Sequence, residues 1–411
     1  MSRLVPMLSA ASCAAFVLLT AGSGHARTLE VGRDADTVSA ALDLSADGDV
    51  VVVPEGIWPG RVRIEHRITL RGPGTIDGGG EGTVVTVAAA GAVIDGLTVR
   101  GSGSDLSDRD SCIYTEVTAE DVRITGSTIR DCAFGIWVNQ SPRAHLIGNH
   151  VFGRASRRPA DRGNGIHLFD ADHLVVRDNV IQGARDGIYV SATDDSLIQG
   201  NQMNGQRYGV HYMYSYRNTL IGNTANGNSG GFALMQSRGL LVEGNVAMDN
   251  DQVGLLFRDA QECRILNNRL ERNAQGMFFF SSTENTIHGN HLVGNQVGAK
   301  IWAGSLRNDV QGNYFTGNAQ QVFYVGAHDL LWGEGGSGNH FSDYVGWDQD
   351  GDGIGDRPHR VDSFTANLLH RYPSAVLLVR SPVLELLAHL EARMPILRVA
   401  TVVDLSPVVS D

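Results

Sequence analysis

Two methionines and a histidine are the residues with the clearest chemistry in this sequence. Met213 and Met235 are 22 residues apart, and His211 lies two positions before Met213. Thioether and imidazole groups together suit a soft ion such as Cu(I), and thioethers resist the oxidation that disables a Cys site outside the cytoplasm. On neighbouring strands, about 4.8 Å apart, such ligands could share one ion. We therefore predict a transiently occupied Cu(I) site; the alternative is that these side chains simply join a hydrophobic surface patch.

A second set of candidate ligands lies in the acidic run DQDGDGIGD at 348–356. Four carboxylates in this run are spaced as in the first half of a D-x-D-x-D-G calcium loop: Asp348, Asp350, Asp352 and Asp356. The twelfth position is His359 and not the bidentate Glu, so the run is not an EF-hand. It predicts a structural Ca²⁺ site, with an unmetallated Asp/Gly turn as the alternative.

These residues sit in or next to a repeat that covers 123–325. The copies align on the Asn of a Gly-Asn pair, and most follow one another by 22 or 23 residues: Asn149, Asn179, Asn201, Asn223, Asn245, Asn268, Asn290 and Asn313. Such a period is typical of a solenoid. In the run that follows a second Gly, the first and third residues are apolar in every copy, which is the period of a strand.

Short strands separated by Gly and Asn turns predict a right-handed parallel β-helix of about 22 residues per coil, so the fold class is all-β. The Asn column is predicted to form an internal ladder or to hold left-handed turns. The expected segments are a signal peptide (1–26), an N-terminal cap (27–61), the β-helix (62–326), a loop-rich segment (327–373) and an amphipathic helical tail (374–411). The tail presents Leu384, Leu387 and Leu390 along one side, and is expected either to cap the solenoid or to dock on a partner.

The second and fourth residues of each Gly-led strand should point outward. This places His211, Met213 and Met235 on one face of the solenoid. Farther along the same face an apolar stripe follows: Leu256, Phe278, Phe280, Trp302 and Phe323. The stripe exceeds the exposed patch that a soluble monomer normally carries, so it predicts a docking surface. The alternative is that a loop or the C-terminal tail folds over it.

Charge and the N-terminal residues bear on compartment and partners. The formal net charge of −12 argues against nucleic acid as a partner. Residues 1–26 combine a basic start, a short apolar run and a small-residue cleavage site, which predicts export by a signal peptide. The remaining cysteines are odd in number; Cys112 and Cys132 lie in neighbouring coils and could pair, and Cys263 then stays free, or all three are buried thiols.

The main competing function is a sugar-acting enzyme. Hydrolysis needs paired carboxylates on neighbouring coils, and the outward columns contain none. A polysaccharide lyase or epimerase could instead use His167, Tyr189 and His211 as acid and base. A uronate site usually needs a cation or several Arg, however, and Arg258 is alone on that face. A passive structural solenoid would not need two methionines in register.

The repeat, with its Gly-Asn turns and GIYV-like strands, is similar to the carbohydrate-binding and sugar-hydrolase β-helix family. More specifically, GWDQDGDGIGDRPHRVDSF followed by LLHRYPSAVLLVRSPVLELLAHLEARMPILR resembles the C-terminal region of the NosD family, the periplasmic maturation proteins for the copper centres of nitrous oxide reductase in denitrification. The resemblance implies a non-enzymatic accessory protein, held at the inner membrane by its partners. Those partners would be an ABC-type membrane permease with its cytoplasmic ATPase, a copper chaperone and nitrous oxide reductase. The resemblance identifies no metal ligands, so the copper assignment depends on register alone.

Overall fold

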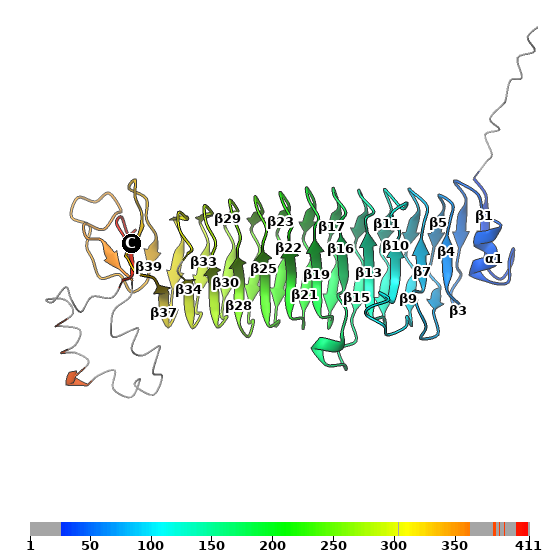
Figure 1. Ribbon diagram of the computed structural model, residues 1–411, viewed down its shortest axis with the longest axis horizontal. Coiled ribbons are helices and arrows are strands. Elements are labelled where there is room, and N and C mark those ends of the chain that lie inside the picture. The colour runs from blue at the N-terminus through cyan, green and yellow to red at the C-terminus, as the bar shows by residue number, and fades with distance from the viewer. Residues whose placement is uncertain are drawn as a thin grey trace, which may run out of the picture.

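The computed structural model describes residues 26–302, 304–361, 381–383, 386, 390 and 400–409. Successive coils of parallel strands stack into a long solenoid, from the blue N-terminal end to the yellow and orange C-terminal end in Figure 1. Each coil contributes one strand to each of three long parallel sheets. This architecture confirms the predicted parallel β-helix.

Within the described ranges, the first sheet contains thirteen strands: β1 (Thr28–Glu30), β2 (Val50–Val52), β5 (Thr69–Arg71), β8 (Val93–Asp95), β11 (Arg123–Thr125), β14 (His145–Ile147), β17 (Val175–Arg177), β20 (Leu197–Gln199), β23 (Thr219–Ile221), β26 (Leu241–Glu243), β29 (Arg264–Leu266), β32 (Thr286–His288) and β35 (Asp309–Gln311). The second sheet consists of β3 (Ile57–Pro59), β6 (Thr75–Asp77), β9 (Thr98–Arg100), β12 (Thr128–Arg130), β15 (His150–Phe152), β18 (Val180–Gln182), β21 (Gln202–Asn204), β24 (Thr224–Asn226), β27 (Val246–Met248), β30 (Arg269–Glu271), β33 (His291–Val293), β36 (Tyr314–Thr316) and β39 (His340–Phe341). The third sheet, which carries the candidate site, consists of β4 (Val62–Ile64), β7 (Val85–Val87), β10 (Ser111–Thr115), β13 (Phe134–Asn139), β16 (Ile166–Phe169), β19 (Asp186–Ser191), β22 (Tyr208–Met213), β25 (Gly230–Met235), β28 (Val253–Arg258), β31 (Gln275–Phe280), β34 (Val297–Trp302) and β37 (Gln320–Val325).

The repeated Asn column forms the internal ladder that the sequence predicts. Asn201 Nδ2 donates to Asn223 Oδ1 at 2.9 Å, and Asn223 Nδ2 donates to Asn245 Oδ1 at 3.0 Å. Each amide also donates to a backbone carbonyl of the preceding coil, so these buried polar groups are satisfied. The left-handed turn conformation is adopted by the residue before each Asn, such as Gly200 or Asp178. The two predicted roles therefore fall on neighbouring residues.

The N-terminal end of the solenoid is covered by the helix α1 (Val38–Asp43). Thr37 caps the helix by accepting a hydrogen bond from Ala40 N, and Val38, Ala41 and Leu42 are buried. The sheets begin ahead of residue 62, because β2 already pairs with β5 and β3 with β6. Residues 1–25, with the predicted signal peptide, lie outside the described residues.

A small separate sheet completes the C-terminal end, with the strand order β38 (Leu330–Trp332), β41 (Val402–Asp404) and β40 (His359–Arg360). Here the predicted helical tail over 374–411 is not supported, because Val402–Asp404 forms a strand. The reason is that β41 pairs on both sides, and the buried Asp404 accepts from Asn339 Nδ2 at 2.8 Å and so ends the Asn ladder. Most of the tail, including Leu384 and Leu387, lies outside the described residues; of its three leucines the structure describes only Leu390.

Cys112 and Cys132 form a disulfide between neighbouring coils, with their Cα atoms 5.5 Å apart. Cys263 is a buried free thiol, and burial raises its pKa to about 11. In the described part of the chain, no helix is long and apolar enough to cross a bilayer.

Candidate functional site

The strand register of the third sheet places the predicted copper ligands on adjacent coils. Met213 at the end of β22 is the register partner of Met235 at the end of β25. His211 pairs with Tyr189 on one side and with Ala233 on the other. Alternate residues of a strand share a face, so His211 and Met213 point to the same side of the sheet. Both methionine side chains are half-buried.

His211 and Met213 line one side of a cleft of about 350 Å³ on the outer face of the third sheet. Segments 102–110 and 153–163, the two excursions from the solenoid, supply part of the wall and are tied together by Arg154, which donates to Ser104 Oγ and to the carbonyl of Ser102 at 2.8 Å each. The 153–163 excursion, which contains the short helix η1 (Pro159–Asp161), extends away from the coils below β15 in Figure 1. The remaining lining residues are Leu106, Phe134, Arg162, Gly163, Asn164, His167, Arg185, Asp186, Tyr189 and Arg207.

His211 is held by a carboxylate that comes from the preceding coil. Its Nδ1 lies 3.1 Å from Asp186 Oδ2, and the His211 and Asp186 side chains are only 8% and 1% exposed. Arg207 Nε donates to Asp186 Oδ1 at 2.8 Å, and its Nη2 binds Asp186 Oδ2. Burial acts to raise the pKa of Asp186, but the hydrogen bonds from His211 and Arg207 outweigh it and lower the pKa. The carboxylate is therefore ionised and fixed.

This arrangement determines which ring nitrogen of His211 is available. A carboxylate can only accept, so we assign the Nδ1 proton of His211 to the bond with Asp186. The opposite nitrogen, Nε2, is buried and has no hydrogen-bond partner. Metal-ligating histidines usually donate their second ring N–H to a carboxylate in this way, which fixes the tautomer and raises the basicity of the ligating nitrogen. The geometry thus presents one unpartnered imidazole lone pair in the cleft.

His167 lies in the same cleft and plays a different part. Its ring stacks on Trp137 with centroids 3.7 Å apart, and its Nδ1 is 3.1 Å from Asn164 Nδ2, which can only donate. Burial lowers its pKa to about 3, so the ring is neutral at physiological pH. Tyr189 stands between the two histidines, with ring centroids 4.8 Å from His167 and 5.0 Å from His211. His167 and His211 therefore do not share one ion directly.

Four charged residues of the cleft are missing from the outward columns that the sequence reasoning considered. Asp186 begins β19, and Arg185 and Arg207 immediately precede β19 and β22, so they sit at turns. Arg162 comes from the 153–163 excursion. The expectation that Arg258 would be the lone arginine here is wrong for this reason. The signal was available in the 22-residue step from Arg185 to Arg207.

The predicted apolar stripe forms one continuous surface over β28, β31, β34 and β37. Trp302 is 40% exposed and contacts Phe278 and Phe280, with ring centroids 5.5 and 5.6 Å away. Leu256 is the register partner of Phe278. Lys300 Nζ lies among the rings, 5.3 Å from Phe278, 5.6 Å from Trp302 and 5.8 Å from Phe323. The stripe therefore carries a cation within it, which the sequence reasoning did not consider.

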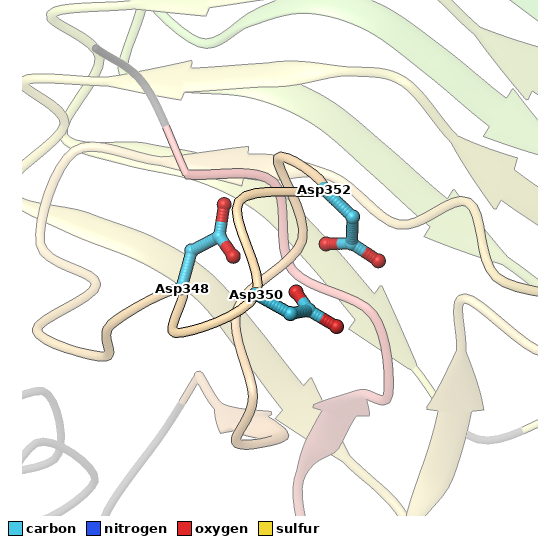
Figure 2. A group of neighbouring side chains, drawn as sticks. All are labelled: Asp348, Asp350 and Asp352. Atoms are coloured by element: carbon cyan, nitrogen blue, oxygen red, sulfur yellow. The ribbon is translucent and has the colours of Figure 1, made fainter.

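The acidic loop brings together three of its four predicted ligands. Carboxylate oxygens of Asp348, Asp350 and Asp352 lie within 4.8 Å of one another. Figure 2 shows the three side chains projecting from one loop toward a common space. Coulombic repulsion from Asp352 raises the pKa of Asp350, whereas backbone hydrogen bonds, first from Gly353, lower that of Asp348. Asp356 is outside this group and accepts from Gln349 N at 2.8 Å.

Comparisons with known proteins agree on the family. A family model described as "Periplasmic copper-binding protein (NosD)" matches residues 147–346. A protein of Pseudomonas aeruginosa named "Probable ABC transporter binding protein NosD" is 41% identical over 89% of this chain and 90% of its own length. A protein of Stutzerimonas stutzeri with the same name is 40% identical over 86% of this chain and 85% of its own.

Among solved structures, a family 28 exopolygalacturonase of Yersinia enterocolitica superposes with a TM-score of 0.56 over 73% of this chain and 77% of its own, at 11% identity. That likeness shows the β-helix fold alone. The two relatives match at high identity over nearly their whole length and are named as binding proteins. The chain therefore belongs to the NosD family of periplasmic copper-binding proteins.

Proposed function

We propose that this protein binds Cu(I) at His211, Met213 and Met235 and supplies it for copper insertion into nitrous oxide reductase. In this role it is an accessory protein and not an enzyme. It receives copper from a chaperone and works with an ABC-type permease and its ATPase at the inner membrane. A soft ion suits two thioethers and one imidazole, because these neutral ligands favour Cu(I) over harder ions.

One observation carries the proposal: the buried Nε2 of His211 has no partner, and its ring is fixed by Asp186 through Nδ1. A buried imidazole nitrogen that lacks a partner costs stability unless a ligand uses it. Met213 lines the same cleft and Met235 is its register partner, so both thioethers lie near that nitrogen. Three ligands on two rigid strands leave a coordination position open for transfer of the ion.

The cleft also speaks against hydrolysis. Asp186 is the one carboxylate among the described residues that line it, and its oxygens are occupied by Arg207 and His211. Glycoside hydrolysis needs two carboxylates that flank the scissile bond. This supports the non-enzymatic part of the proposal.

The test is an anaerobic titration of the mature protein with Cu(I) against a chromophoric chelator. The wild type should bind one equivalent, and a variant with both Met213→Leu and Met235→Leu should lose that binding while its circular dichroism spectrum and melting temperature stay the same. Met248→Leu is a matched control, because Met248 is half-buried on the second sheet, away from the cleft. Undiminished Cu(I) binding by the double variant would rule out these ligands.

For the permease contact we propose the apolar stripe around Trp302. Its exposed indole and the neighbouring phenylalanines are the kind of aromatic surface that protein interfaces bury. Trp302→Ser should reduce co-purification with the permease, whereas Phe152→Ser, which removes a 39% exposed ring from the second sheet, should not. Equal co-purification of the two variants would refute this contact. Deleting the whole tail would be a poorer test, because it removes β41 and the end of the Asn ladder.

We also propose that the loop of Asp348, Asp350 and Asp352 holds a structural Ca²⁺. Three carboxylates this close repel one another, and a divalent cation relieves that repulsion. The ion would stabilise the C-terminal end next to β41 and has no direct part in copper handling.

A further inference from the structure

A stack of arginines stands at the edge of the cleft. Arg207 N donates to the carbonyl of Arg185 at 2.7 Å, and Arg185 N donates to the carbonyl of Gly163 at 2.9 Å, so these three residues occupy the same position in consecutive coils. Arg162, next to Gly163, brings a third guanidinium to the same wall. The arginines of neighbouring coils are about 4.8 Å apart at the backbone, where like charges disfavour one another.

The negative charge at this wall does not balance the arginines. Asp186 is the single carboxylate among the described lining residues, and Arg207 already forks it. Arg185 is exposed, and its guanidinium makes no ion pair or hydrogen bond with any part of the chain that the structure describes. Three arginines face one carboxylate, a local excess of positive charge in a chain whose formal charge is −12. Such an excess attracts an anion.

Two of the arginines are held in place with donors to spare. Arg162 Nε and Nη2 donate to the carbonyls of Arg157 and Ala155 at 2.8 and 2.7 Å, which fixes the guanidinium and leaves Nη1 without a bond. Arg207 Nε and Nη2 are engaged by Asp186, and its Nη1 likewise makes no bond within the described residues. A guanidinium has five N–H donors in a planar fork that matches a carboxylate. The wall thus offers a preorganised set of donors.

The other side of the cleft is apolar and aromatic. Phe134 and Leu106 line it, and Phe134 packs edge-on against Trp137 with centroids 4.7 Å apart. Tyr189 is half-buried, and its hydroxyl makes no hydrogen bond to a described residue. An inorganic anion would leave this apolar wall unused, whereas a ring-sized body would cover it. The volume of about 350 Å³ is in the range of small-molecule sites.

We propose that this cleft binds a small organic acid, with its carboxylate on Arg162, Arg185 and Arg207 and its ring-sized body against Phe134 and Leu106. This ligand is separate from the copper of the proposed function, since it uses the turn residues and the excursions and not the two methionines. The protein would then carry two ligands on neighbouring parts of one face.

The experiment is isothermal titration of the mature protein with two acids and their neutral counterparts: D-galacturonate against D-galactose, and benzoate against benzyl alcohol. At least one acid should bind saturably, and neither neutral compound should. Arg185→Gln should weaken that binding about tenfold, because it removes an unpaired cation without breaking an internal bond. Arg264→Gln, an exposed arginine on the first sheet, is the matched control and should bind as the wild type does.

Copper titration of the same variants keeps the two ideas apart. Arg185→Gln should retain Cu(I) binding, and the variant with both Met213→Leu and Met235→Leu should retain the acid. Absence of saturable binding for both acids, equal binding of a neutral counterpart, or an unchanged affinity in Arg185→Gln would each overturn the organic-acid site. Inorganic phosphate that binds where both acids fail would also overturn it, since the site would then take a plain oxyanion.

Discussion

The carboxylate behind His211 should control copper affinity although it never touches the ion. Asp186 accepts from His211 Nδ1 at 3.1 Å and is forked by Arg207. In Asp186→Asn the amide oxygen would turn to Arg207, which can only donate, and the amide NH₂ would face His211. His211 Nδ1 would then accept, its proton would move to Nε2, and the ligating lone pair would be lost. Loss of such an outer partner typically costs 10- to 100-fold in metal affinity, or about 1.4–2.7 kcal/mol.

A competition assay with a Cu(I) chelator at pH 7 measures this directly. The matched control is Asp195→Asn, because Asp195 is forked by Arg217 in the same way, at 2.8 and 2.7 Å, but on the surface and without a histidine. We expect Asp195→Asn to bind Cu(I) with wild-type affinity. If folded Asp186→Asn binds Cu(I) within twofold of the wild type, then His211 is not a ligand oriented by this carboxylate, and the copper assignment loses its main support.

Three further predictions concern stability. The folded-state pKa of His167 lies near 3, below its unfolded value of 6.5, so the unfolded chain binds a proton that the folded chain excludes and stability falls as pH drops below 6.5. His167→Gln should remove about 2 kcal/mol of the stability lost between pH 7 and pH 5, measured by urea unfolding; an unchanged loss would contradict the burial argument. Asn223→Ala breaks ladder bonds on both sides and should cost about 3 kcal/mol, whereas the exposed Asn204→Ala should cost less than about 0.5. Ca²⁺ should raise the melting temperature of the wild type and not that of a variant with both Asp350→Asn and Asp352→Asn; an equal rise in both would remove the calcium site.

The fold could be predicted from the sequence because every coil obeys the same constraints. An Asn at a fixed step must bond to the next Asn, and apolar residues at alternate positions must face inward, so register follows from spacing alone. For this reason the pairing of Met213 with Met235 could be read from their separation. The C-terminal end does not repeat, and there the leucine pattern suggested a helix at a place where Val402–Asp404 forms a strand. Pairing with strands distant in sequence decides that structure, and local periodicity does not contain it.

The site was predictable only in part, for a related reason. The residues that point outward from strands could be listed, and they include His211 and Tyr189. Asp186 could not be placed, because a residue at the boundary between turn and strand turns inward or outward according to its partners. Its two partners, Arg207 and His211, belong to the next coil, so only the three-dimensional stacking brings the three side chains together.

The distinctive chemistry of this protein lies where the repeat departs from itself. At one turn position, successive coils carry Gly163, Arg185, Arg207 and Ser229, all 22 residues apart, so the backbone repeats while the side chains do not. The conserved geometry of the coils fixes where each side chain begins, and the variable side chains then build a cleft that no single coil contains. A rigid ladder next to a variable wall can therefore position ligands from different coils without any moving part. On this view a substitution in the Asn ladder should disturb the cleft by shifting register, whereas a substitution in the wall should change its ligands and leave the solenoid intact.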